Sequence, residues 1–193
     1  MANPEEILAF WLDQIGPKGW YKGDAALDDE IRTRFQSTWD EAMTGAKGLW
    51  LTHASGTLAY IILTDQLPRN MFRGTAQAFA SDKMARAASK IALSRSWDVR
   101  IDEPARQFFY MPLLHSENLC DQDRGIRLMA TRMPDSDGVN LLHAQAHRDI
   151  IRQFGRFPFR NDALGRASTT AEKEYMAAGG YMSTVRALEA AAA

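Results

Sequence analysis

The stretch TLAYIILTDQLPRN, residues 57–70, decides the fold. Residues 57–67 are apolar on nearly every side of a helix, so we expect a central helix that its neighbours bury. Pro68 lacks a backbone N–H, and its ring clashes with a continuing helix, so the helix is predicted to end there. The rest of the chain would then form a frame of helices around this one.

Helices are predicted on both sides of the central stretch. Asn3-Pro4-Glu5-Glu6 combines an N-cap, a proline at the first helical position and an acidic residue that reaches back. Thr169 to Glu172 repeats this capping-box pattern near the other end. Ser116 is expected to cap a helix that ends near Met133, and another helix is expected over 75–95. Since no segment alternates apolar and polar residues like a strand, the sequence predicts an all-α protein of stacked antiparallel helix pairs.

Composition sets the broad class of the protein. The 193 residues are 46% hydrophobic and include five tryptophans, which is enough for a buried core in one domain over residues 1–193, with a C-terminal tail over 181–193. The 23 basic and 24 acidic residues nearly balance, so no global charge attracts nucleic acid or an anionic membrane. The longest apolar run, residues 58–63, is too short to cross a membrane. With the single Cys120 and no leader-like start, we expect a cytoplasmic protein.

A second informative segment is FGRFPFRN, residues 154–161, which is followed by LGRAS, residues 164–168. Gly155 can end the preceding helix in a left-handed conformation, and Pro158 disfavours helix in the residue before it. The segment is therefore predicted to be an ordered loop. Its three arginines are Arg156, Arg160 and Arg166. Guanidinium groups held at fixed spacing suit the recognition of a carboxylate or a phosphate.

Three composite motifs, in order along the chain, carry a resemblance to a known family. They are Ile62 to Asn70 with Arg73-Gly74; Tyr110-Met111-Pro112 with His115-Ser116-Glu117 and Gln122; and His147-Arg148 with residues 154–161 and 164–169. Through them the chain resembles the bacterial family called domain of unknown function 924, over about residues 5–174. The resemblance implies a helical fold similar to tetratricopeptide-repeat arrays, and it assigns no biochemical role.

Two positions depart from the pattern of that family. Phe159 stands where the family usually has a histidine, and Thr64 stands where an apolar residue is common. If the histidine has a chemical role in the family, this chain has lost it.

The motifs supply the candidate site residues. Histidine carries protons near neutral pH, and a glutamate can orient it or act as a base, so the catalytic candidates are His115, Glu117 and His147. The ligand-binding candidates are the polar residues of the motifs: Asp65, Gln66, Arg69, Asn70, Arg73, Tyr110, Arg156, Arg160, Asn161 and Arg166. These residues are predicted to meet in one site. The competing interpretation is that the arginines bond helix-end carbonyls or pair with carboxylates.

Other kinds of site are disfavoured. A nucleophilic Ser116 is a weak hypothesis, because nothing resembles the strained elbow of a serine hydrolase. His143 and His147 have the spacing of a two-histidine metal face, but Ala144 replaces the glutamate that usually follows the first histidine. We therefore predict no metal site, and the cofactor stays open. A basic stripe with interleaved phenylalanines can bind single-stranded nucleic acid, but the balanced charge argues against it here.

The sequence leaves two classes of function open. One is a site for an anionic small molecule, with acid–base catalysis by histidine and glutamate as an option, so enzyme status stays open. The other is a non-catalytic helical module that binds an acidic peptide or protein partner.

Overall fold

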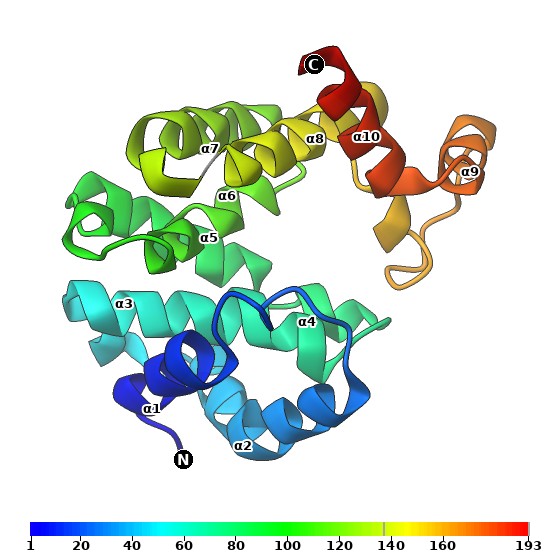
Figure 1. The fold of residues 1–193 in the computed structure, drawn as a ribbon. Helices are drawn as coiled ribbons and strands as arrows, with labels where there is room; N and C mark the ends of the chain where they lie inside the picture. Colours follow the sequence, from blue (N-terminus) through cyan, green and yellow to red (C-terminus); the bar gives the residue numbers. More distant parts are fainter. Residues whose placement is uncertain (137, 193) are drawn as a thin grey trace. The chain divides into compact units, whose positions relative to one another are not determined.

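Helices make up all the regular secondary structure in residues 1–136 and 138–192, the part of the chain that the computed structural model describes (Figure 1). This confirms the predicted all-α class. The chain divides into two compact units, Met1–Pro112 and Leu113–Ala193. Two compact units can still form one domain, so the single-domain assignment and the likeness to tetratricopeptide repeats stay predictions.

The first unit contains α1 (Pro4–Leu8), α2 (Ala25–Met43), α3 (Ala54–Ile61), α4 (Leu67–Met71) and α5 (Asp82–Ser94). The second contains α7 (Leu119–Arg132), α8 (Val139–Phe154), α9 (Thr170–Ala177) and α10 (Gly180–Ala192), while α6 (Met111–Leu114) contains the boundary. The shorter helical segments are Ala9–Ile15, Gly48–Thr52, Ile62–Gln66, Ala76–Phe79, Asp98–Arg100, Ala105–Phe109, Pro134–Ser136 and Pro158–Arg160.

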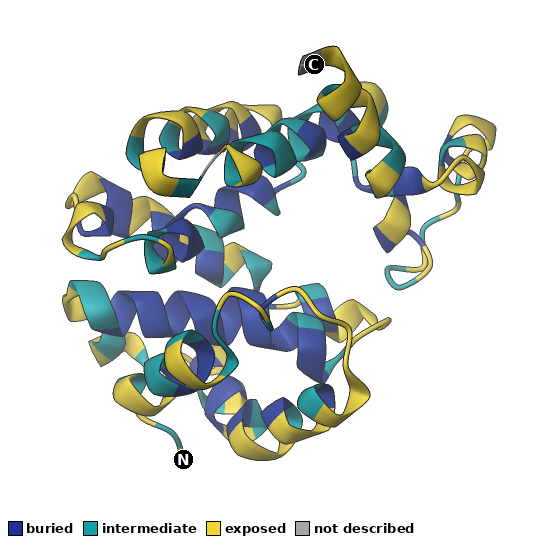
Figure 2. Ribbon diagram, in the orientation of Figure 1, coloured by how far each residue is buried: buried dark blue, intermediate teal, exposed yellow. Residues whose placement is uncertain are grey.

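The central helix of the first unit is the predicted one. Helix α3, the π-helical segment Ile62–Gln66 and α4 follow one another without a break (Figure 1). Nearly all of this path is buried (Figure 2). It packs against α1, α2 and α5, whose inner faces supply much of the apolar core around it. The apolar stretch therefore does decide the fold of this unit.

The prediction that Pro68 ends the central helix is wrong. In the π-helical segment before it, the N–H of Leu67 reaches back five residues to the carbonyl of Ile62. In an α-helix, a residue with a backbone N–H at position 68 would donate to the carbonyl of Thr64, but proline has no such N–H. That carbonyl instead accepts a hydrogen bond from the hydroxyl of Ser81 at 2.6 Å. Because the buried carbonyl finds another donor, the helix continues through the proline to Met71.

The capping predictions had mixed outcomes. Both capping boxes, at Asn3 and at Thr169, are confirmed. The predicted role of Ser116 is wrong, because the N-cap of α7 is Asn118, whose side chain accepts from the two backbone N–H groups that follow it. The hydroxyl of Ser116 instead donates to Asp121 at 2.9 Å. The helix expected over 75–95 begins later, at Asp82, after a short 3-10 turn.

The second unit is organised around α8, which packs against α7 and α10. Its buried apolar cluster consists of Ile150, Ile151 and Phe157, with Phe154, Tyr175 and Tyr181 packed against it. Helix α8 ends at Gly155 with φ of 70°, as predicted from the sequence. The region assigned as a tail lies in α10 as far as residue 192, and residue 193 lies outside the described residues. No helix in the described part is long and apolar enough to span a membrane.

Candidate functional site

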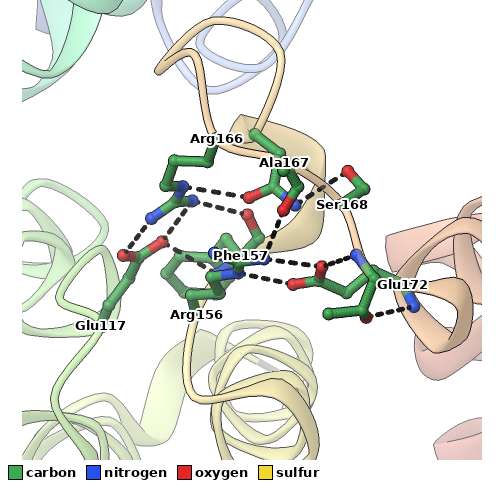
Figure 3. Close-up of polar contacts among 9 residues, drawn as sticks. Glu117, Arg156, Phe157, Arg166, Ala167, Ser168 and Glu172 are labelled. Carbon is green, nitrogen blue, oxygen red and sulfur yellow. Dashed lines mark hydrogen bonds and ion pairs between the residues drawn. The ribbon is translucent and has the colours of Figure 1, made fainter.

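Glu117 joins the second and third motifs within the second unit. Its Oε2 accepts from Nη1 of Arg166 at 2.7 Å, and its Oε1 accepts from Nη2 of Arg166 at 3.0 Å. Oε1 also accepts from the backbone N–H of Phe157 at 2.9 Å. Figure 3 shows the carboxylate of Glu117 facing the guanidinium of Arg166. Both oxygens of the predicted catalytic base therefore hold the arginine loop in place.

Arg166 in turn closes the loop on itself. Its Nη2 donates to the carbonyl of Phe157 at 3.1 Å, and its Nε donates to Oδ1 of Asn161 at 3.0 Å. The amide of Asn161 donates to the hydroxyl of Ser168 at 3.0 Å. Burial acts to raise the pKa of Glu117, but the bonds from Arg166 and from the Phe157 N–H outweigh it, so this pKa lies below its usual value.

Arg156 ties the loop to the start of α9. Its Nε and Nη2 donate to the two carboxylate oxygens of Glu172 at 2.6 and 2.8 Å, and Nη2 also donates to the carbonyl of Ala167 (Figure 3). The second Glu172 oxygen accepts from the backbone N–H of Thr169, which completes the capping box. These bonds, with that of Arg156 first, lower the pKa of Glu172 to about 2. Arg156 therefore has a structural partner.

Arg160 occupies a different environment in the same loop. It is only 6% exposed, and its guanidinium carbon lies 4.5 Å from the centre of the Phe157 ring. Such a cation over an aromatic face is held in position by the ring. Its charge contributes to lowering the pKa values of both Glu117 and His147, so the guanidinium lies near these two predicted site residues.

His115 and His147 come together beside this loop. Their ring centres are 6.1 Å apart, and the His147 ring meets Phe157 edge to face at 5.5 Å. Nδ1 of His147 lies 2.8 Å from the carbonyl of His143. Because a carbonyl only accepts, Nδ1 carries the proton, and Nε2 of the neutral ring is a hydrogen-bond acceptor.

His147 is neutral over the whole physiological range. Burial is the largest cause that lowers its pKa, to about 3, and the nearby charges of His115, Arg160 and His143 act in the same direction. The hydrogen bond to the His143 carbonyl opposes them. Burial is therefore the main reason why His147 stays neutral, and the neighbouring basic groups add to it.

The depressed pKa of His147 predicts a loss of stability in acid. Unfolded histidine titrates near pH 6.5, so between pH 6.5 and 3 the unfolded state binds the extra proton, and stability falls as the pH falls. Between pH 7 and pH 5 this group should cost about 2 kcal/mol. Urea denaturation at the two pH values measures the loss. His147→Phe keeps a ring without the titrating nitrogen, so it should show a smaller loss. Equal losses in the two proteins would contradict the assignment.

His143 has a structural role and no metal-site geometry. Its Nδ1 lies 2.7 Å from the hydroxyl of Tyr181 on α10, and the two rings stack with their centres 5.9 Å apart. Burial raises the pKa of Tyr181, so its hydroxyl stays protonated and shares a hydrogen bond with Nδ1 of His143. No group of three or more metal-ligating side chains that could hold an ion occurs among residues 1–136 and 138–192.

In the first unit, Arg69 is a helix-end anchor. Its Nη2 donates to Asp82 at 2.6 Å and lies 3.6 Å from Asp65, and its Nη1 bonds the carbonyl of Ala78. The fully buried Asp65 also accepts from the side chain of Gln66. These contacts match the structural interpretation of the arginines.

Asn70 and Arg73 share one carboxylate, that of Asp28 on α2. Asn70 donates to its Oδ1 at 2.8 Å, and Arg73 donates to both oxygens at 2.6 and 2.9 Å. The Arg73 bonds are the largest cause of the lowered pKa of Asp28. Tyr110, expected to face a ligand, is fully buried and donates to Asp98 at 2.8 Å.

The structure adds acidic partners that were not among the candidate site residues, namely Asp28, Asp98 and Glu172. The sequence carried one signal for Glu172, because the predicted capping box places it in the first turn of the helix that directly follows the arginine loop. The structure brings two residues of the second motif next to the third motif: His115 lies beside His147, and Glu117 pairs with Arg166. A shared site with the first motif stays a prediction.

Comparison with known proteins extends the resemblance carried by the three motifs. The family model described as "Bacterial protein of unknown function (DUF924)" matches residues 7–180. Among solved structures, the chain is similar to ATU0120, a protein of unknown function from Agrobacterium tumefaciens, with 39% sequence identity and a TM-score of 0.84 over 90% of this chain and 96% of that chain. No curated protein matches. The chain belongs to the family of bacterial proteins of unknown function DUF924.

Proposed function

We propose that the protein binds a small anion on its second unit, at Arg160 with His115 and His147. The observation that carries this proposal is geometric: the Arg160 guanidinium and the His147 ring both lie against Phe157, and the His115 ring centre is 6.1 Å from that of His147. An anion near Arg160 would be attracted by its fixed charge and would favour the protonated form of the neighbouring His147. The planar guanidinium of Arg160 matches a phosphate or a carboxylate in shape.

The proposal centres on Arg160 because of the rings around its guanidinium, which lies 4.5 Å from the centre of the Phe157 ring. The His147 ring contacts that same Phe157 ring, so an anion at Arg160 would lie close to an imidazole that can take up a proton.

Binding, rather than acid–base catalysis, is the function that the geometry supports best. A base is most effective when its pKa lies near the working pH, and a pKa of about 3 makes His147 a weak base at pH 7. Both oxygens of Glu117 already accept hydrogen bonds from the loop. Catalysis and the helical module for acidic peptides stay as alternative predictions.

Inorganic phosphate is expected to raise the pKa of His147 by about one pH unit or more, because an anion close to the ring favours the protonated form. NMR titration of the His147 ring in phosphate, against sodium chloride of equal ionic strength, measures this change. The wild-type chain suffices for this experiment. An unchanged titration curve at saturating phosphate would contradict the proposed site.

A pair of variants locates the anion. Arg160→Gln should abolish the rise in melting temperature that phosphate gives, since ligand that binds only the folded state stabilises it. Arg152→Gln removes the same charge from an exposed position on α8 and should keep the effect. If both variants respond to phosphate like the wild type, the anion binds elsewhere.

A further inference from the structure

The turn that carries Arg160 also presents an aromatic ring to solvent. Phe159 is 41% exposed, although it neighbours the fully buried Phe157, and the two ring centres are 5.2 Å apart. Arg160 covers Phe157, so one short turn holds a cation and an accessible aromatic surface next to each other. Neither the fold nor the proposed anion contacts explain why Phe159 is exposed.

The backbone of this turn is fixed before any ligand arrives. Pro158 begins the 3-10 turn Pro158–Arg160, the N–H of Arg160 donates to the carbonyl of Phe157 at 3.1 Å, and the N–H of Asn161 donates to that of Pro158 at 3.0 Å. The Phe157 carbonyl also accepts from Arg166, which Glu117 holds in turn. A ring on such a rigid support loses little freedom when a ligand packs against it.

A second ring flanks Phe159. Tyr181 of α10 meets it edge to face, with the ring centres 6.4 Å apart, and Tyr181 also contacts the ring of His147 at 5.1 Å. The four rings of His147, Phe157, Phe159 and Tyr181 therefore form a connected aromatic set beside Arg160. A hydrophobic ligand group on Phe159 would extend this set rather than stand alone in water.

From this juxtaposition we propose that the anion bound at Arg160 carries an aromatic ring, and that this ring packs on Phe159. The inference rests on the proposed anion site and names the class of its ligand, an aromatic phosphate or an aromatic carboxylate. The acidic group contacts the guanidinium, and the ring covers the exposed side chain one residue away. A cationic ligand is disfavoured by the charge of Arg160.

Phenyl phosphate compared with methyl phosphate tests the inference. The two esters carry the same charged group, so a difference in affinity reports the ring. Isothermal titration calorimetry should give a dissociation constant about tenfold lower for phenyl phosphate, as expected from aromatic contact and apolar burial. Phe159→Ala should bring the ratio of the two constants close to one, whereas Phe159→Tyr keeps a ring and should keep the preference.

The outcomes separate the two proposals. If phenyl and methyl phosphate bind the wild type equally, or if Phe159→Ala keeps the preference for phenyl phosphate, the aromatic ligand class is wrong while the anion site stands. If neither ester nor inorganic phosphate binds or shifts the His147 titration, the anion site itself fails. Because Phe159 is exposed, its variants are expected to fold, and the two-ester comparison on the wild type needs no variant at all.

Discussion

Ser81→Ala is expected to lower the free energy of unfolding by about 3 kcal/mol. The Ser81 hydroxyl is fully buried, donates to the carbonyl of Thr64 at 2.6 Å and accepts from Nε1 of Trp39 at 3.0 Å. Alanine leaves both of these groups without that partner in the core, and each costs about 1–3 kcal/mol. Urea denaturation at pH 7 measures the effect.

Two further variants show whether the proline is the reason for this cost. Ser94→Ala removes a hydroxyl that only bonds a carbonyl of its own exposed helix end, so its effect should stay within about 0.5 kcal/mol. In a Pro68→Ala background, Ser81→Ala should cost less than in the wild type, because the new backbone N–H at position 68 can bond Thr64. If Ser81→Ala costs no more than Ser94→Ala, the hydroxyl does not support the helix through Pro68.

The local parts of the fold could be predicted from the sequence. The capping box at Asn3 and the helix end at Gly155 depend on residues within a few positions of each other, so their signals lie in adjacent letters. The path through Pro68 could not be predicted in the same way. It depends on a π-helical turn and on the hydroxyl of Ser81, 17 positions after Thr64, which only the folded structure brings to the Thr64 carbonyl.

The candidate site shows the same division. Among the candidate residues, Arg166 and Glu117 meet in an ion pair, and Arg73 pairs with Asp28. The sequence does not indicate which carboxylate meets which arginine, because 24 acidic residues are available and pairing depends on tertiary contact. Glu117 was predicted to orient a histidine or to act as a base, because it shares a motif with His115. Its position 49 residues before Arg166 gave no sign that the two side chains pair.

Glu117→Ala is expected to lower the free energy of unfolding by about 3 kcal/mol. It removes both contacts to the guanidinium of Arg166 and the acceptor for the N–H of Phe157. Arg166 would then be a partly buried cation without its carboxylate, because its side chain is 23% exposed. Such a residual charge is costly even when the intact pair contributes little. Chemical denaturation at neutral pH, where the carboxylate is ionised, measures the change.

The size of the Arg166 contribution follows from a matched set of variants. Glu174→Ala on the exposed face of α9 should change stability by no more than about 0.5 kcal/mol. Glu117→Gln keeps an acceptor for the Phe157 N–H but loses the charge, so its cost should lie between those of Glu117→Ala and Glu174→Ala. Arg166→Met should cost much less in the Glu117→Ala background than in the wild type, since the unpaired charge is then removed. Additive effects of these two substitutions would show that the pair does not hold the loop, and Glu117 would again be available as a base.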